Sequence, residues 1–134
     1  MGVAWELQKA VYAVLSTDAA LLASAVTGVF DDVDEDYEGF PYITVGEDNI
    51  VERDTDGSEG YTASITVHIW SRVKSQQEVK TLQGLVYTAL HRVPLTITGF
   101  DCILCRQTEQ ISLRDPDGQT RHGVQTFELI IYRS

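Results

Sequence analysis

Basic residues, cysteine and long apolar runs are all scarce in this 134-residue sequence. Ten Lys and Arg stand against twenty Asp and Glu, a formal net charge of −10. Such a surface repels phosphates, which disfavours sequence-specific or groove-tracking DNA binding. No apolar run approaches the roughly 20 residues that cross a bilayer, and Glu6 and Lys9 interrupt an N-terminal stretch that has no basic region. We therefore expect no membrane partner, no signal peptide, and a protein made and kept in a cytoplasm.

Cysteine occurs only at Cys102 and Cys105. The flanking residues, FDCILCRQTEQISL, predict a strand, whereas redox CxxC motifs lie at a helix N-terminus. In a strand a spacing of three predicts side chains on opposite faces, a poor geometry for a disulfide. A zinc site needs a second ligand pair, which the chain lacks. We expect two structural thiols, no metal and no cofactor.

The negative charge is concentrated in one part of the sequence. Residues 29–60 hold twelve acids and one base, a charge of −11, so the remaining residues carry +1. The densest stretch, DDVDEDYEGF, places Asp32, Asp34 and Asp36 like the first three ligands of a calcium loop. Tyr37 and Ile43 stand where the glycine and the closing glutamate are needed, which excludes an EF-hand. A solvated acidic loop is the favoured interpretation, and a looser cation site is the alternative.

Hydrophobic periodicity predicts a single α+β domain over residues 1–134. Residues 3–15 and 76–92 have apolar side chains at helical spacing, and Asp18 is suited to cap a short helix before Gly28. The stretch PYITVGED, which Ile50 to Arg53 extend past a bend at Gly46, is expected to form a hairpin with the strand 61–72. The strands 100–114 and 123–133 are expected to form a second hairpin around the turn sequence DPDG. The order is ααββαββ, with helices packed on a mostly antiparallel sheet.

No catalytic motif is present. The chain has no GxSxG, no phosphate-binding glycine loop and no HExxH, and its three histidines lie in no nucleophile motif. His91, near the end of the predicted helix 76–92, is suited to interact with the helix C-terminus. We expect the protein not to be an enzyme.

One face of the strand 61–72 is unusual. Ile65, Val67 and Ile69 share the apolar face, which leaves His68 and Trp70 on the opposite side. Ile130 and Tyr132 likewise point away from the apolar face of the last strand. If both strands lie in one sheet, these four side chains form a patch of the kind that binds partners. The alternative is that the helix 3–15, with Trp5 and Tyr12, covers this face within the subunit.

The sequence resembles a known family. PYITVGED, a loop rich in Gly, Asp and Ser, TVHIWSR followed by a helix with Glu78, and a closing DPDGQTRHGVQTFELII are similar to the tail-completion proteins of long-tailed phages. These virion structural proteins are also called tail terminators, and similar ones occur in gene transfer agents. The resemblance extends over most of the chain.

The resemblance implies an α+β subunit of a hexameric ring at the head-proximal end of the tail. Such a ring caps the tail tube, binds the tube protein and the head-tail connector or stopper protein, and joins head to tail. Double-stranded DNA passes through its lumen without specific binding. The charge pattern fits this role, because acidic loops repeated around a channel repel DNA. The localisation implied is the virion, after assembly in the host cytoplasm.

A second hypothesis treats the acidic segment as a DNA mimic. On this interpretation the protein is a binding module that occupies the basic site of a nucleic-acid enzyme and inhibits it. The candidate partner-binding residues are the acids Asp31, Asp32, Asp34, Asp36, Glu38, Asp54, Asp56 and Glu59, and the patch residues His68, Trp70, Ile130 and Tyr132.

Overall fold

A computed structural model describes residues 2–134. The helices are α1 (Val3–Thr17), α2 (Ala19–Leu22) and α3 (Gln77–Leu90). The strands are β1 (Val29–Phe30), β2 (Tyr42–Glu52), β3 (Gly60–Ser71), β4 (Thr96–Ile97), β5 (Phe100–Arg114) and β6 (Arg121–Arg133). The α+β class and the order of the main elements are confirmed. The two-residue strand β4 has no counterpart in the sequence analysis, because two residues are too few to show a period.

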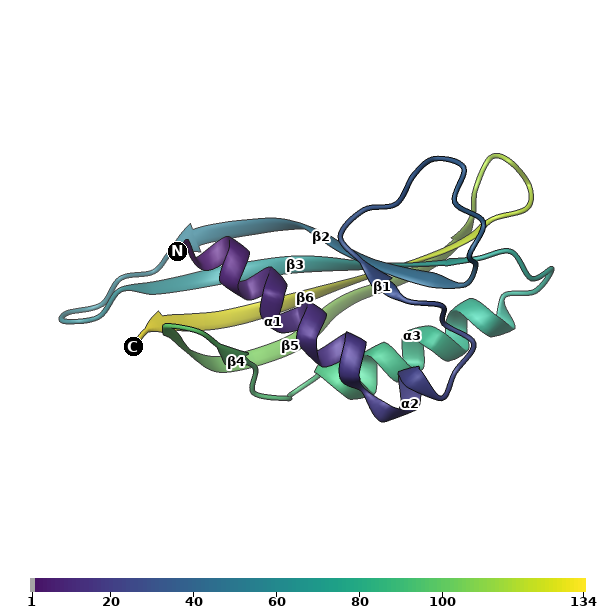
Figure 1. The fold of residues 1–134 in the computed structure, drawn as a ribbon. Coiled ribbons are helices and arrows are strands. Elements are labelled where there is room, and N and C mark those ends of the chain that lie inside the picture. Colours follow the sequence, from purple (N-terminus) through teal and green to yellow (C-terminus); the bar gives the residue numbers. More distant parts are fainter. Residues whose placement is uncertain (1) are drawn as a thin grey trace.

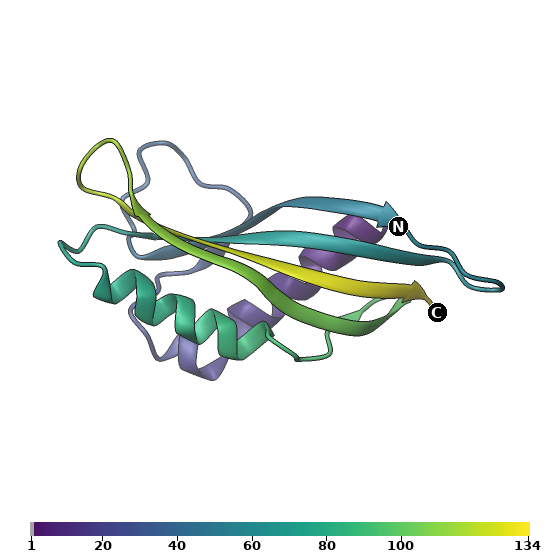
Figure 2. The same cartoon turned by 180° about the vertical axis from the view of Figure 1, so that it is seen from behind.

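The six strands form one long sheet in the order β1-β2-β3-β6-β5-β4. The predicted hairpins β2–β3 and β5–β6 are both present, and β3 pairs antiparallel with β6 between them. Figure 1 shows α1 crossing one face of this sheet diagonally, with α3 beside it over β5. Seen from behind, the other face of the sheet has no helix on it (Figure 2). We call these the helix face and the outer face.

The core lies between the sheet and the two long helices. Ile65, Val67 and Ile69 of β3 are buried there, as their alternation predicts, together with Phe127, Leu129 and Ile131 of β6. The stripe Leu7, Val11 and Leu15 of α1 belongs to the same cluster. Burying such side chains stabilises the fold by about 1.5–3 kcal/mol each. The strand β6 lies between β3 and β5, and Ile130 and Tyr132 of its later half are half-buried on the other face of the sheet.

The helix α3 approaches β6 closely at Gly123. A Cβ added to Gly123 would lie 2.8 Å from the Gln83 amide nitrogen and 2.9 Å from a methyl group of Val79. Gln83 is fully buried, and its amide donates to the Ile111 carbonyl at 2.8 Å. The Gln125 amide in turn donates to the Gln83 carbonyl at 3.0 Å. Glycine at position 123 therefore leaves the space in which these buried polar groups find their partners.

Bulges alter the strand pattern at two strands. In β2 the register shifts between Gly46 and Asp48, and Glu47 adopts a φ of 45°, which agrees with the bend expected at Gly46. In β5 it shifts between Cys102 and Leu104 and again between Gln107 and Glu109.

The first bulge in β5 overturns the prediction that the two cysteines point to opposite faces. Cys102 pairs with Ile131 and Cys105 with Leu129, both of which are buried on the helix face. The extra residue, Ile103, restores the phase, so both thiols point towards the core. Both are free, and Cys105 is buried.

The helix α1 lies wholly on the helix face, so the alternative in which it covers Trp70 is wrong. Its buried residues share a cluster with Ile65, Val67 and Ile69, whereas Trp70 points to the outer face. None of the helices among residues 2–134 combines the length and the apolar character that crossing a membrane requires.

Candidate interaction surfaces

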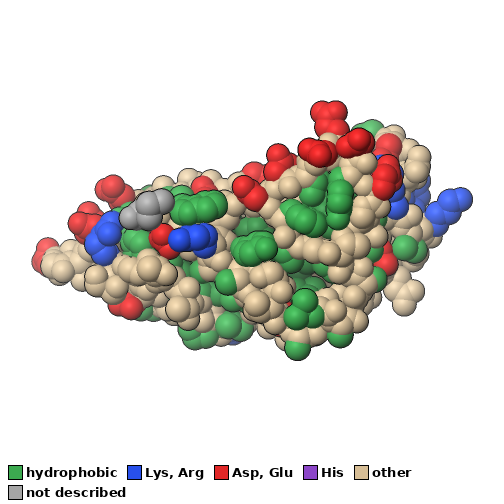
Figure 3. Space-filling view, viewed as in Figure 1, with side chains coloured by type: hydrophobic (Ala, Val, Ile, Leu, Met, Phe, Trp, Pro, Cys, Tyr) green, Lys and Arg blue, Asp and Glu red, His purple; other side chains and the backbone are tan. Residues whose placement is uncertain are grey.

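The acidic segment that is continuous in sequence is divided between the two ends of the sheet. The loop of residues 31–41 projects at one end, beside the turn of residues 115–120, and the tip of the β2–β3 hairpin extends from the other (Figure 1). Acidic side chains are correspondingly seen at both ends of the molecule (Figure 3). We call these ends the loop end and the tip end. The prediction of one acidic region does not hold in three dimensions, because an eleven-residue strand separates its two halves.

At the loop end the acidic side chains are exposed but the backbone beneath them is held. Asp31 accepts a hydrogen bond from the Gln8 amide of α1 at 2.7 Å. Glu38 accepts one from Arg72 at 2.8 Å. Between these anchors the ring of Tyr37 packs edge-on against Phe30, with 5.5 Å between centroids. The loop therefore presents its carboxylates, Asp31, Asp32, Asp34, Asp36 and Glu38 among them, from a fixed frame.

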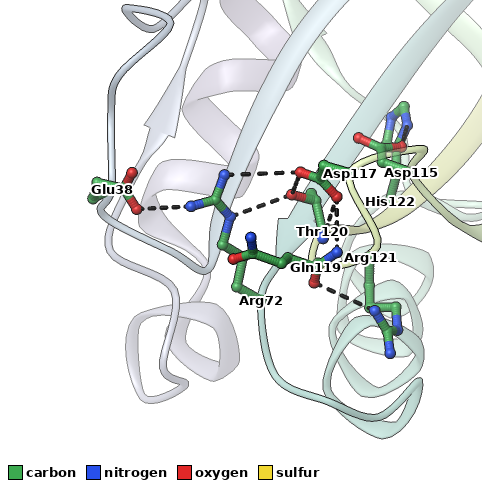
Figure 4. A network of polar contacts seen from close by, with 8 residues as sticks. All are labelled: Glu38, Arg72, Asp115, Asp117, Gln119, Thr120, Arg121 and His122. Atoms are coloured by element: carbon green, nitrogen blue, oxygen red, sulfur yellow. Dashed lines mark hydrogen bonds and ion pairs between the residues drawn. The ribbon is translucent and has the colours of Figure 1, made fainter.

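Arg72 joins this loop to the turn between β5 and β6 (Figure 4). Besides Glu38, its guanidinium donates to the Thr120 hydroxyl at 3.2 Å and lies 3.9 Å from the Asp117 carboxylate. The pKa of Asp117 is lowered to about 2, chiefly by hydrogen bonds from the backbone and hydroxyl of Thr120 and the backbone of Gln119. Asp117 thus stays ionised and organises its own turn while it faces Arg72.

Trp70 is half-buried within the subunit by other aromatic rings. Its indole stacks on His122 with 3.8 Å between centroids, and Tyr42 lies on its other flank at 6.3 Å. The indole N–H donates to Thr44 at 3.2 Å. Tyr42 is itself buried, and burial raises its pKa. The loop rings of Phe40 and Tyr37 pack against Tyr42 at 5.0 and 5.1 Å, so the loop end and the Trp70 face form one structure.

A chain of four titratable side chains runs beside Trp70. His68 Nε2 lies 2.6 Å from Glu47, His68 Nδ1 lies 2.7 Å from His122 Nε2, and His122 Nδ1 lies 3.7 Å from Asp115. Burial, followed by the nearby His68, lowers the pKa of His122 and favours the neutral form of that ring. With the His122 proton on Nε2, that nitrogen donates to His68 Nδ1, and His68 Nε2 donates to the Glu47 carboxylate. The hydrogen bond to Glu47 also holds the β2 bulge in place.

The tip end is more lightly held. Asp54 accepts from the backbone N–H of Gly60 at 3.2 Å, and Glu59 pairs with Arg133 at 2.7 Å. Asp56 is exposed. Within residues 2–134, no three or more His, Cys, Asp or Glu side chains are arranged so that they could hold a metal ion.

The four residues predicted to form one patch lie on the outer face in two separate groups. Trp70 pairs across the strands with His122, and Thr62 pairs with Ile130. Eight residues of β6 therefore separate the two groups, about 26 Å at 3.3 Å per residue. Ile130 and Tyr132 are half-buried near the tip end, and polar side chains of the central strands occupy the space between. Alternation along a strand predicts the face of a residue but not its distance from another residue on that face.

A further surface was not predicted. Trp5 and Tyr12 are each 46% exposed on α1, and with Phe30 and Val45 they line an apolar groove of about 470 Å³ along the β2 side of the helix. Gln8, Lys9 and Asp31 also line this groove. In the sequence this groove is indicated only by the spacing of Trp5 and Tyr12. They lie seven residues apart, on a side of α1 that differs from the core stripe of Leu7, Val11 and Leu15. Arg72 and Glu47 were also missed, because their importance depends on contacts between distant segments.

Comparison with known proteins gives consistent matches. The family described as "Tail completion protein gp17" matches residues 9–132. The chain is 26% identical over 85 residues to the tail completion protein gp17 of Bacillus phage SPP1. That alignment covers 63% of this chain and 63% of the relative, less than two thirds of its length.

Two solved structures share the fold. A chain of the virion of a native gene transfer agent particle superposes with a TM-score of 0.85 at 20% identity, covering 98% of both chains. The structure of the bacteriophage SPP1 gp17 protein gives a TM-score of 0.61 at 23% identity, covering 94% of this chain and 88% of that one. At these identities the likeness concerns the fold.

Proposed function

Because the chain belongs to the tail completion protein gp17 family, a family of structural tail proteins and not of enzymes, we propose that it is a ring-forming tail terminator of a phage or phage-like particle. It caps the tail tube and joins the tail to the head connector, and the genome passes through its lumen. The observation that carries this proposal is the family match over residues 9–132, nearly the whole chain.

The partners follow from this position. The chain forms a homo-oligomer, a hexameric ring, that contacts the tail tube protein on one side and the head-tail connector or stopper protein on the other. A long sheet with loops at both ends is suited to contact two axial partners (Figure 1).

The charge distribution supports DNA passage without binding. The exposed carboxylates lie at both ends of the sheet, and whichever end faces the lumen presents a negative wall once it is repeated around the ring. DNA phosphates are repelled from such a wall over about 8–10 Å at physiological ionic strength. The loop end has the denser set, so Asp31, Asp32, Asp34 and Asp36 are the carboxylates whose loss should matter most.

The test is to delete the gene in the particle that encodes it and to supply variants in trans. Without the protein we expect heads and tails that do not join, with tails of uncontrolled length, by negative-stain microscopy. A variant with Asn at Asp34 and Asp36, whose side chains are exposed and do not hold the loop, should fold and join heads to tails but deliver DNA more slowly. Normal joined particles from the deletion would refute the proposal, and normal delivery by the variant would refute the lumen role of these acids.

The DNA-mimic hypothesis is less well supported. A mimic needs its carboxylates along one continuous surface at phosphate-like spacing, whereas the loop and tip acids lie at opposite ends of the molecule (Figures 1 and 3). A pull-down that captured a nucleic-acid enzyme through both acidic ends would revive it.

A further inference from the structure

The backbone groups at the two edges of the sheet have different partners. The strand β1 pairs only with Ile43 and Thr44, which leaves the rest of β2 as an open edge. At the opposite edge, the equally short β4 pairs with Phe100 and Asp101 of β5. The segment after α3 caps the next part of β5, where the Arg92 N–H donates to the Cys105 carbonyl at 2.7 Å and the Gln107 N–H donates to His91 Nδ1 at 3.0 Å. An open edge with unpaired backbone groups is a natural place for another chain to dock.

The open edge is accompanied by the apolar groove on α1. Trp5 and Tyr12 stand one heptad apart on the side of α1 that faces β2, and the ring of Phe30 and the side chain of Val45 complete the lining. Large aromatic side chains that are half-exposed around an apolar hollow are typical of the anchor positions of interfaces. Nothing else in the described part of the subunit fills this groove, and Figure 3 shows apolar side chains around a hollow on this face.

Charge decides which surface of a second copy fits there. Residues 3–52, which build α1 and the open edge, contain eleven acids and one base, the whole of the chain's net charge of −10. Residues 77–114, which build α3 and the β5 edge, contain three acids and four bases, a net +1. Two open edges brought together would therefore repel, whereas an open edge against a β5 edge would not.

The β5 edge also carries a suitable projection. Ile103 is the extra residue of the first β5 bulge and is 64% exposed, although it is aliphatic. Arg106, three residues further along the strand, is paired with Glu128 of β6 by hydrogen bonds of 2.9 and 3.2 Å, and the Arg92 N–H donates to the Cys105 carbonyl. Arg92 has a φ of 60°, a conformation that usually requires Gly or Asn after a helix. An exposed aliphatic side chain on an edge that carries no net negative charge complements an aromatic groove beside carboxylates.

We propose that copies of this chain associate head to tail, with Ile103 on the β5 edge of one copy inserted into the groove formed by Trp5 and Tyr12 on the open edge of the next. The contact is heterologous, so repeating it generates a closed ring or an open helix and never a symmetric dimer. The inference rests on the proposed function in that it names the surfaces that join the subunits of the ring.

The test is disulfide trapping in the purified full-length chain. In a Cys102→Ser background, Gln8→Cys places a thiol in the groove between the two aromatic anchors and Ile103→Cys places one at the projection. Cys105 is retained, because burial raises its pKa to about 12 and leaves it unreactive. The matched control is Ser16→Cys with Ile103→Cys. Ser16 is half-buried on the same helix, about 12 Å from Gln8 at 1.5 Å per residue, which is beyond the reach of a disulfide made at Gln8.

Under mild oxidation the groove pair should give a ladder of dimers, trimers and larger species on non-reducing gels, about tenfold faster than the control pair, as expected for an oriented and electrostatically favoured encounter. High salt should slow it. Equal rates for the two pairs would overturn the proposal. Dimers from Gln8→Cys alone, formed as fast as from the groove pair, would also overturn it, because they indicate groove-to-groove contact. None of these results depends on a tail, so they are separable from the gene-deletion test.

Discussion

Replacing Trp70 with Ala should destabilise the subunit itself. From the sequence alone Trp70 is a misfit on a polar face, which would predict a loss of assembly and little loss of stability. In the structure the indole contacts His122 and Tyr42 and donates a hydrogen bond to Thr44. These contacts lie within one chain, so their loss changes the free energy of unfolding.

The magnitude follows from the burial of the ring. Truncating a fully buried Trp or Phe to Ala costs about 3–5 kcal/mol. Trp70 is only half-buried, so the transfer contribution is smaller, and the outer face can partly close around the space. Stacked aromatic pairs contribute about 0.5–1.5 kcal/mol beyond their area. We therefore expect Trp70→Ala to lower the free energy of unfolding by about 2–3 kcal/mol.

The assay is urea denaturation followed by circular dichroism, with the slope m compared between variants to confirm that the same surface is exposed. Trp5→Ala is the matched control, since Trp5 is the other tryptophan and is 46% exposed at the groove. It should cost about 1 kcal/mol or less. A change below about 1 kcal/mol for Trp70→Ala would refute the reasoning. It would mean that the ring stacking contributes little and that the outer face is held ready for a partner.

Three further predictions concern other contacts. Burial lowers the pKa of His122 below its ordinary value of 6.5, so the unfolded chain binds the proton more readily than the folded chain. The free energy of unfolding should therefore keep its full value above pH 6.5 and decrease as the pH falls below 6.5. In denaturation curves His122→Gln should weaken this dependence on pH. Arg72→Ala should speed amide hydrogen exchange at Tyr37 and leave the β6 amides unchanged, because it detaches the loop from the 115–120 turn. Gly123→Ala should lower the free energy of unfolding by about 1–3 kcal/mol through overpacking against Gln83, and unchanged stability would show that α3 can move away.

Much of the fold could be predicted because it depends on local patterns. The strand β3 is an unbroken alternation, and its partners β2 and β6 have similar ones, so both hairpins and the burial of Ile65 and Phe127 follow from period two and turn residues. The cap at Asp18 was also predictable, and its carboxylate does accept from the Leu21 N–H at 3.1 Å. The helix it starts is shorter than expected and ends at Leu22.

The candidate surfaces could not be predicted to the same extent, because they depend on register and on distance. A single extra residue at Ile103 reverses the expected orientation of Cys102 relative to Cys105, and nothing local marks the bulge. The acidic loop of residues 31–41 and the acidic hairpin tip are neighbours in sequence, but the length of β2 separates them in space. The net charge summed over residues 29–60 therefore suggested one acidic region where the structure has two. Sequence showed that Trp70 faced away from the core, but its stack on His122 joins strands whose pairing no pattern specifies.

The two acidic ends differ in how their carboxylates are used, and this determines which substitutions report on charge alone. At the loop end Asp31 and Glu38 hold the loop through Gln8 and Arg72, so neutralising them also loosens it. Within residues 2–134, the side chains of Asp34, Asp36 and Asp56 make neither a hydrogen bond nor an ion pair, and all three are exposed. Asn at 34 therefore removes one charge per subunit from the loop end without removing a contact, and Asn at 56 removes one from the tip end. A difference in DNA delivery between these two variants identifies the end that faces the genome, because neither changes the packing through which the ring would form.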